Sequence, residues 1–359
     1  MTKKKILFYA INGVGLGHLN RLLLVAKAIK KLNRKTSIFF ITNSGFTALI
    51  KKNNFPLLKI KENWEPIGEK TSFAVKKIID SRNIGAIVYD THFNFFLFNI
   101  FKERNVKNIL ILRETDNMRP SKFISEYYKD FDLILVPHAR EELRSRGKTN
   151  LLMGNLRSFK KIKFIGPIVQ EKPTRKINLG KNKFNILATC GGGGQDKNNT
   201  GIDDFLAMIK SASKILAKKI ENLNLIVVTG PLYKGKFNIN IKGVVIKKYQ
   251  RNLLGMMEVA DLVISSAGYN ICNEIIAAKA PSILVPLKRF QESQSRRAKR
   301  LGKKRVALVL RGFCSKILIK KVLDLYKNPA KLRRMRKNFD KIKLKRGNKI
   351  AAKMILDLL

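Results

Sequence analysis

The feature that most constrains this 359-residue chain is a regular alternation of short apolar runs with longer segments of helical periodicity. Apolar runs of about five residues, bounded by Gly, Pro or Asn, are typical of buried parallel strands, and the helical segments between them supply the crossovers. The sequence therefore predicts an α/β protein with doubly wound parallel sheets. In the first half, the predicted strands are residues 6–10, 37–42, 86–90, 108–112 and 133–137.

The alternation occurs twice, because it lapses over residues 166–183 into Gly, Pro and charged residues and then restarts. The later predicted strands are residues 185–190, 225–229, 244–247, 262–265, 282–286 and 306–310. We therefore predict an N-terminal Rossmann-like domain over 1–165, a linker over 166–183 and a C-terminal Rossmann-like domain over 184–335. Residues 336–359 are predicted to form a basic C-terminal helix that packs across the junction.

Charge limits the partners. The chain has 74 Lys and Arg against 25 Asp and Glu, a formal net charge of +49. Such a charge favours anionic partners, but without a basic arm or an aromatic RNA motif we expect no specific nucleic acid. A lysine-rich proteome or a solvated basic face explains the same charge.

Cysteine content and hydropathy indicate where in the cell the protein is expected. Three cysteines without C-x-x-C spacing indicate neither disulfides nor a zinc site, so we expect a cytoplasmic protein without a bound metal. No apolar run is long enough to span a bilayer, which leaves peripheral contact with the inner face of a membrane open.

The first predicted strand leads into a glycine loop, residues 12–18, and then a helix. Backbone N–H groups and the helix dipole at such a junction can meet an anion. The loop is no dinucleotide fingerprint, because His18 holds the third glycine position and no acidic residue closes the second strand. His18 is a candidate base or a structural residue, and Arg21 is assigned to the polar face of the helix.

Two further strand–turn–helix junctions lie in the second half. Gly191–Gly194 follow one strand and have the context for phosphate contact, although a flexible turn is the alternative. The turn that contains Ser266, Gly268 and Asn270 precedes a helix whose N-terminus can stabilise a departing diphosphate without a metal. On that helix, Glu274 is a candidate ribose ligand or a surface carboxylate.

The first half also places polar residues after its strands, at the rim where open α/β sheets bind ligands. These acceptor-side candidates are Asp90, His92, Arg113, Glu114 and Asp116. Helix capping or loop packing explains Asp90, Asp116 and His92 equally well. The aromatic stretch over 93–101 indicates core packing or a lipid-binding surface.

Gly15-x-Gly17-His18, residues 260–274 and residues 286–294 together resemble the MurG-like glycosyltransferases of family 28. The resemblance covers roughly 184–310 and, in the first half, only the first strand, glycine loop and helix. It implies the GT-B fold, with two Rossmann-like domains facing a central cleft, a UDP-sugar donor and no metal or other cofactor. The glycine run before His18 is shorter than is usual in the family, and Gln195 and Asp196 follow Gly194, so the donor stays open.

By this resemblance, His18 is a catalytic candidate, and its glycine loop with Gly15 and Gly17 lies on the acceptor side. From their place at the rim of the sheet, Asp90 is the second catalytic candidate, and His92 and Arg113 are further acceptor-side candidates. The donor-side candidates are Gly191, Gly192, Gly193, Gly194, Ser266, Gly268, Asn270, Glu274, Gln291, Glu292 and Gln294. Glu274 matches the family's ribose-binding glutamate, and Gln291 and Gln294 fall in its sugar-contacting stretch.

The expected function is transfer of a hexose or N-acetylhexosamine from a UDP-sugar to a hydroxyl of a lipid-linked or otherwise anionic acceptor. Inversion at the sugar carbon is expected, with His18 or Asp90 as the base. A sugar-nucleotide hydrolase or epimerase is the alternative within the same fold. A non-catalytic protein that binds nucleic acid or membrane through its charge is the alternative from another class.

Overall fold

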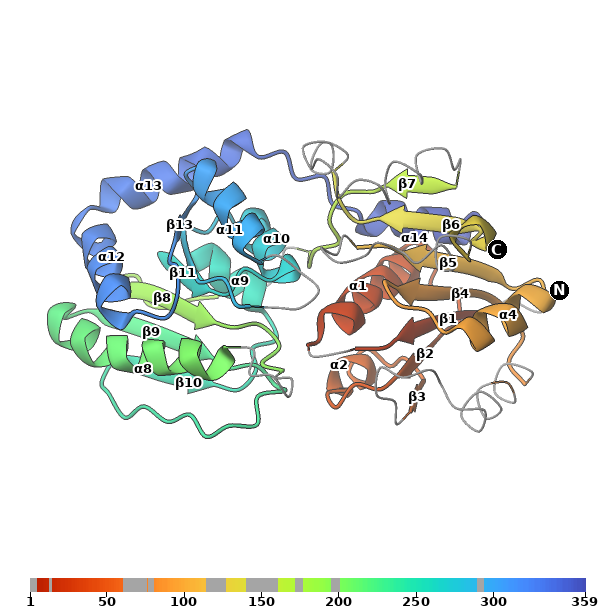
Figure 1. The fold of residues 1–359 in the computed structure, drawn as a ribbon, viewed down its shortest axis with the longest axis horizontal. Helices are drawn as coiled ribbons and strands as arrows, with labels where there is room; N and C mark the ends of the chain where they lie inside the picture. The colour runs from red at the N-terminus through yellow and green to blue at the C-terminus, as the bar shows by residue number, and fades with distance from the viewer. Residues whose placement is uncertain are drawn as a thin grey trace. The chain divides into compact units, whose positions relative to one another are not determined.

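The computed structural model describes residues 5–12, 15–60, 76, 81–113, 127–139, 161–171, 177–194, 201–288 and 294–359. The chain forms two compact units (Figure 1). Unit 1 contains Met1–Val169 and Lys345–Leu359, and unit 2 contains Gln170–Leu344. Each unit is built on one parallel sheet, so the predicted fold class of two doubly wound α/β domains is confirmed.

Unit 1 has a seven-stranded sheet in the order β3-β2-β1-β4-β5-β6-β7, in which all pairings are parallel. The chain runs from β1 outward to β3 and then returns to the other side of β1 at β4. The order therefore reverses between β1 and β4, which makes this pair the switch point of the sheet. The strands are β1 Lys5–Ala10, β2 Ile38–Thr42, β3 Leu57–Lys59, β4 Ile84–Asp90, β5 Lys107–Ile111, β6 Leu133–Val136 and β7 Ile162–Phe164.

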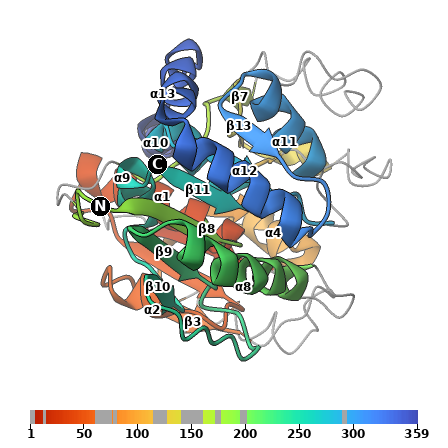
Figure 2. The ribbon, with the colours of Figure 1, turned by 90° about the vertical axis from the view of Figure 1, so that its left-hand side faces the viewer.

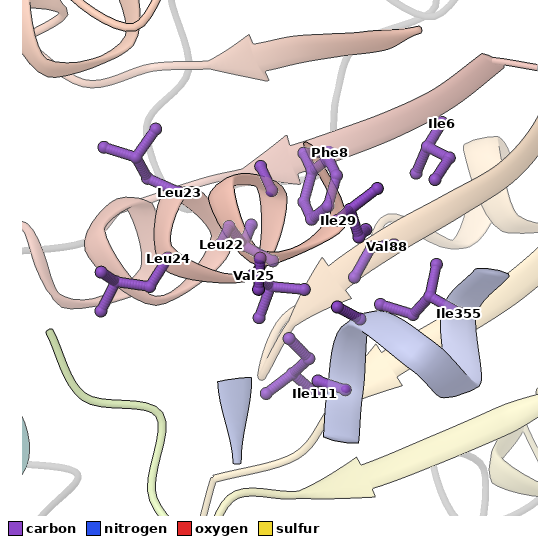
Figure 3. Packing of buried hydrophobic residues seen from close by; sticks show 14 of the residues in the cluster. Ile6, Phe8, Leu22, Leu23, Leu24, Val25, Ile29, Val88, Ile111 and Ile355 are labelled. Carbon is purple, nitrogen blue, oxygen red and sulfur yellow. The ribbon is translucent and has the colours of Figure 1, made fainter. Parts of the chain in front are cut away.

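Helices cover both faces of this sheet. The described helices of unit 1 are α1 Gly17–Leu32, α2 Ala48–Lys51, α4 Phe95–Glu103 and α14 Asn348–Leu356. Alternate strand residues pack on α1 and α14 on one face, and their neighbours pack on α4 on the other. Figure 3 shows the first of these cores, which brings together Phe8, Leu22, Val25, Ile29, Val88, Ile111 and Ile355.

Unit 2 repeats the plan with six parallel strands in the order β10-β9-β8-β11-β12-β13. Its switch point lies between β8 and β11, where the order again reverses. The strands are β8 Phe184–Thr189, β9 Leu223–Val228, β10 Val244–Lys247, β11 Leu262–Ser265, β12 Ser282–Leu284 and β13 Ala307–Val309.

The described helices of unit 2 are α8 Ile202–Lys219, α9 Leu253–Val259, α10 Tyr269–Ala278, α11 Gln294–Lys303, α12 Ser315–Lys327 and α13 Pro329–Asn338, with a 3-10 turn at Phe339–Lys341. Helices α8 and α12 pack on one face of the sheet, against alternate residues of β8, β9 and β11. Figure 2 shows these two helices lying over the strands.

The C-terminal segment differs from its prediction. A single basic helix was expected over 336–359, but α13 ends at Asn338 and α14 begins at Asn348. Gly347 donates to Pro167 O at 2.9 Å, and a Cβ on Gly347 would meet the Gly166 carbonyl. The buried Asn348 side chain binds both the N–H and the C=O of Val169, at 3.1 and 2.9 Å. These contacts join α14 to unit 1.

Candidate active site

The two switch points carry most of the predicted site residues that the structure describes. In unit 1, His18 lies on α1 just after β1, and Asp90 is the last residue of β4. In unit 2, Gly191–Gly194 follow β8, and Glu274 lies on α10, the helix after β11. Open α/β sheets bind ligands outside the carboxyl ends of their strands at such points. Topology thus brings these residues to the edges where ligands bind.

Asp90 is the centre of a buried polar cluster in unit 1. Its side chain is fully buried, and its Oδ1 lies 2.7 Å from His18 Nδ1. Arg21 donates from Nη2 to the same oxygen at 2.5 Å and from Nε to Oδ2 at 2.8 Å. The Thr91 hydroxyl donates to Oδ1 at 3.1 Å. Both carboxylate oxygens are therefore engaged by donors from α1 and from the adjacent loop.

This arrangement decides the protonation of the cluster. Burial alone would raise the pKa of Asp90, but the Arg21 guanidinium and the His18 ring together hold it well below its ordinary value. An ionised carboxylate 2.7 Å from His18 Nδ1 requires a proton on that nitrogen, which leaves the lone pair on Nε2. Asp90 therefore suits the role of orienting His18, and the geometry does not support the prediction that Asp90 is itself the base.

Burial, reinforced by two nearby cations, keeps the His18 ring neutral. Burial lowers the pKa of His18; Asp90 opposes this effect, and the Arg21 and Arg113 cations add to it. His92 faces His18 edge to face, with ring centroids 5.6 Å apart. Burial, together with His18, lowers the pKa of His92 to about 3. Since 13% of the His18 side chain is exposed, a neutral imidazole is accessible at this edge of the sheet.

Thr91 holds Asp90 and His92 in a strained turn. Its φ is 64°, in the left-handed region that β-branched residues rarely adopt. The His92 N–H donates to Asp90 O at 2.7 Å across the turn, and the Thr91 N–H donates to Ile111 O at 2.8 Å. Strain of this kind persists where the surrounding structure enforces it, and it is concentrated at functional sites.

The glycine loop of unit 1 leads into α1 without an acidic cap. Asn12 Oδ1 accepts from the Leu19 N–H at 3.1 Å, and the Asn12 backbone pairs with the Asn43 side chain. A Cβ on Gly15 would meet nothing within 4 Å. Gly17 is the first residue of α1. The loop therefore has open space beside Gly15, next to a helix N-terminus that favours anions.

The glycine cluster of unit 2 is partly explained by packing. A Cβ on Gly193 would lie 2.5 Å from Thr229 O and 3.0 Å from Gly230 Cα, so this loop and the end of β9 approach backbone to backbone. The Gly191 N–H is already bound by the Thr189 hydroxyl, at 3.1 Å, and Gly192 O accepts from Leu232 N. Contact of Gly191–Gly194 with a diphosphate stays a prediction, and close packing accounts for Gly193.

The turn before α10 is tied to the start of α11. Gln294 Oε1 accepts from the Ala267 and Leu287 N–H groups at 3.0 and 3.1 Å, and Arg297 Nε donates to Ala267 O. The buried Ser266 hydroxyl donates to Cys190 O at 3.4 Å. The carbonyl of Gln294 is thus occupied by the fold, and contact of this side chain with the sugar stays a prediction.

Gly268 and Asn270 begin the helix that carries the second carboxylate. Gly268 is the N-cap residue of α10, a Cβ there would meet nothing within 4 Å, and Asn270 is half-buried in the first turn. Glu274 is 8% exposed, and no residue in the described part of the chain forms a hydrogen bond or ion pair with its carboxylate. Burial raises its pKa to about 7. Glu274 is therefore not the surface carboxylate of the alternative interpretation.

Several predicted residues lie outside the described ranges: Glu114, Asp116, Gln195, Asp196, Gln291 and Glu292. Within those ranges, no group of three or more His, Cys, Asp or Glu side chains is placed to hold a metal ion. The sequence interpretation was wrong about Arg21, which is 2% exposed rather than on the polar face of its helix. Its spacing of three residues from His18 could have revealed this, since such positions share a helix face.

The aromatic stretch after His92 is mostly core. Phe93 and Phe98 make ring contacts with Tyr127 and Phe131, and Phe95 makes one with Tyr127. Of the five phenylalanines in the stretch, Phe96 is the one that is largely exposed, at 56%. No helix in the described ranges is both long and apolar enough to cross a bilayer.

Comparison with known proteins finds a domain match and several relatives. Residues 199–353 match the glycosyltransferase family 28 C-terminal domain. A UDP-N-acetylglucosamine--N-acetylmuramyl-(pentapeptide) pyrophosphoryl-undecaprenol N-acetylglucosamine transferase of Clostridium botulinum is 32% identical over 186 residues, 48% of this chain and 51% of the relative. In that match the chain spans about half the length of the relative. The protein of the same name from Acetivibrio thermocellus is 23% identical over 96% of this chain and 95% of its own.

A solved structure agrees with these matches at the level of the fold. The crystal structure of Acinetobacter baumannii MurG superposes with a TM-score of 0.61 at 14% identity, covering 98% of this chain and 99% of that one. Two parallel-sheet α/β units and this neighbour correspond to the GT-B fold expected from the sequence. The domain match over less than half of the chain, the relative that aligns along nearly its whole length and the shared fold together make the chain similar to the MurG-like glycosyltransferases of family 28.

Proposed function

We propose that the protein is a glycosyltransferase that moves an N-acetylhexosamine from a UDP-sugar to a hydroxyl group of its acceptor. The observation that carries this proposal is the His18–Asp90 pair at the switch point of unit 1. A neutral, partly exposed imidazole whose Nδ1–H is held by a buried carboxylate is a general base suited to neutral pH. Transfer to a hydroxyl requires such a base.

In the proposed reaction, His18 Nε2 takes the proton of the acceptor hydroxyl as its oxygen attacks the sugar C1. The bond between C1 and the diphosphate oxygen breaks, and UDP leaves with the bonding electrons. A single displacement inverts the configuration at C1. Asp90 stabilises the imidazolium that forms, as buried carboxylates do for catalytic histidines.

Unit 2 is proposed to hold the donor without a metal. The N-terminus of α10 at Gly268, where space is open, suits the charge of the departing diphosphate. Glu274, buried without a partner in the described ranges, suits the ribose hydroxyls. The named relatives act with UDP-N-acetylglucosamine, which supports that sugar as the donor group. Gln291 and Glu292 remain predicted contacts to the sugar.

The acceptor is proposed to be lipid-linked and anionic. The relatives are named for a pyrophosphoryl-undecaprenol acceptor. Arg113 and the open loop at Gly15 lie with His18 on unit 1 and suit a diphosphate. The net charge of +49 and the exposed Phe96 support peripheral contact with an anionic membrane from the cytoplasmic side.

The test is product analysis with UDP-N-acetylglucosamine and a short-chain polyprenyl diphosphate-linked sugar as acceptor. Transfer gives a glycosylated acceptor, hydrolysis gives the free sugar, and epimerisation gives a changed sugar still on UDP. We expect transfer in the wild type and a loss of about 100-fold or more in His18→Gln. His138→Gln, in the same unit but after β6, is the matched control. Free or epimerised sugar as the sole product would refute the transferase.

Strongly salt-dependent nucleic-acid binding without nucleotide binding would instead favour the non-catalytic alternative. A thermal-shift panel of UDP-, GDP-, dTDP- and ADP-sugars tests the donor base, and we expect stabilisation by the UDP-sugar alone.

A further inference from the structure

The family resemblance and the sequence pattern leave one member of the unit 1 cluster without a role. Arg21 is 2% exposed and is among the largest fully buried side chains in the described ranges. A buried guanidinium is costly unless a carboxylate neutralises it, and Asp90 does so through two hydrogen bonds. A third side chain also contacts this carboxylate.

The third member is His18, and it uses the same oxygen. His18 Nδ1 and Arg21 Nη2 lie 2.7 and 2.5 Å from Asp90 Oδ1 and 3.3 Å from each other. His18 and Arg21 are three positions apart on α1, so one helix face presents both to β4. The guanidinium partly neutralises the negative charge of Asp90, so this charge stabilises a protonated imidazole less strongly.

We propose that Arg21 is a positioning residue that acts through Asp90 and sets the basicity of His18, so that the imidazole stays neutral at physiological pH. This inference rests on the proposed function, in which His18 is the base. Without Arg21, the full charge of Asp90 would stabilise the imidazolium and offset the burial that disfavours it, so that His18 would hold its proton up to a higher pH.

The other groups that face His18 do not replace Arg21. Asp90 on β4 is the carboxylate identified beside the ring, and the further charged or titratable neighbours are His92 after β4 and Arg113 after β5. Arg113 acts on His18 as a positive charge, but no hydrogen bond in the described ranges links it to Asp90. Arg21 is therefore the group positioned to balance the Asp90 charge.

The experiment measures the titration of His18 directly. The chain has three histidines, so a full-length protein labelled with ¹³C-histidine gives three Cε1–Hε1 signals that histidine-to-glutamine variants assign. Arg21→Gln keeps a donor for Asp90 but removes the charge, and Arg21→Lys keeps the charge. We expect Arg21→Gln to raise the pKa of His18 by about 1–2 units and Arg21→Lys to leave it within about half a unit.

The His138 signal, from the end of β6, reports whether unit 1 stays folded. An unshifted His18 in a folded Arg21→Gln variant, or equal shifts in both variants, would overturn the proposal. If the glutamine variant does not fold, the lysine variant decides, because a shifted His18 there contradicts a role for the charge.

The readout needs no turnover, so it separates this inference from the proposed function. In Arg21→Gln, the acid limb of the pH–rate profile should shift to higher pH together with the pKa of His18. If the pKa of His18 shifts in Arg21→Gln but the pH–rate profile does not, His18 is not the base, although Arg21 still acts on it. If activity is lost while the pKa of His18 is unchanged, the proposed effect of Arg21 on His18 is refuted, and the role of His18 as the base is not.

Discussion

The switch points of the two units each hold a buried carboxylate, and the two carboxylates differ in their hydrogen-bond partners and in the direction of their pKa shifts. Asp90 in unit 1 accepts hydrogen bonds from three side chains of its own unit, and its pKa is held low. Glu274 in unit 2 is paired with no described residue, and burial raises its pKa to about 7. The same topology thus supports a carboxylate organised by the protein and one whose hydrogen bonds a ligand would provide.

The largest effect is expected from removing the charge of Asp90, the carboxylate whose hydrogen bonds the protein itself provides. Asp90→Asn leaves the Arg21 charge buried without its counterion, which should lower the free energy of unfolding by about 3–5 kcal/mol at pH 7. Asp130→Asn is the control, because Asp130 pairs with a Lys102 side chain that is 55% exposed, and it should cost less than about 1 kcal/mol. Urea denaturation measures both, and equal losses would contradict the comparison.

The contribution of Asp90 to stability depends on pH in a way that follows from the direction of its pKa shift. The folded-state pKa of Asp90 lies below its unfolded value, so its stabilisation is present above about pH 4 and is lost as the pH falls. Asp90→Asn should accordingly flatten the acid limb of the stability profile.

The unpaired carboxylate should behave in the opposite way. Because the folded pKa of Glu274 is raised to about 7, its contribution is most favourable below about pH 4.5 and is lost as the pH rises through 7. The free energy of unfolding of Glu274→Gln should therefore exceed that of the wild type by up to about 3 kcal/mol at pH 8 and equal it at pH 4. The exposed Glu221→Gln is the control in the same unit. A destabilised Glu274→Gln at pH 8 would show that the fold itself pairs this carboxylate.

The glycine loops beside the two carboxylates also differ, because one is closely packed and the other has open space. Gly193→Ala should cost about 1–3 kcal/mol, because its Cβ would press on Thr229 and Gly230 and its φ is 72°. Gly15→Ala should change the free energy of unfolding by less than about 1 kcal/mol, since its Cβ meets nothing within 4 Å. Thermal denaturation of the two variants measures this, and equal costs would refute the assigned packing role of Gly193.

The smallest effect concerns nucleotide affinity. If ribose hydroxyls donate to an ionised Glu274, binding must remove its proton, so affinity for UDP should fall up to about tenfold per pH unit below 7. Calorimetry between pH 6 and 8 measures the affinity and the released proton. Glu274→Gln should bind more weakly and without this pH dependence; an unchanged pH dependence would exclude Glu274 as its source.

The sequence predicted the sheets well because buried parallel strands form continuous apolar runs. It missed β3 and β7, the two edge strands of unit 1, which are three residues long and only partly buried. The family resemblance pointed to the chemistry at His18 and Glu274. It did not reveal that Asp90 is locked by Arg21, because a single polar residue on an amphipathic helix is normally exposed, and its spacing from His18 was the available signal to the contrary.

The return of α14 to unit 1 affects how the protein is made. Ala351, Ala352 and Ile355 complete a core whose other members lie in the first half of the chain. On a ribosome, which delivers the chain from its N-terminus, the α1 face of the first sheet must wait for these residues while the whole of unit 2 is synthesised. During that interval the apolar surface later covered by α14 is open to chaperones, so the second unit can finish folding before the first.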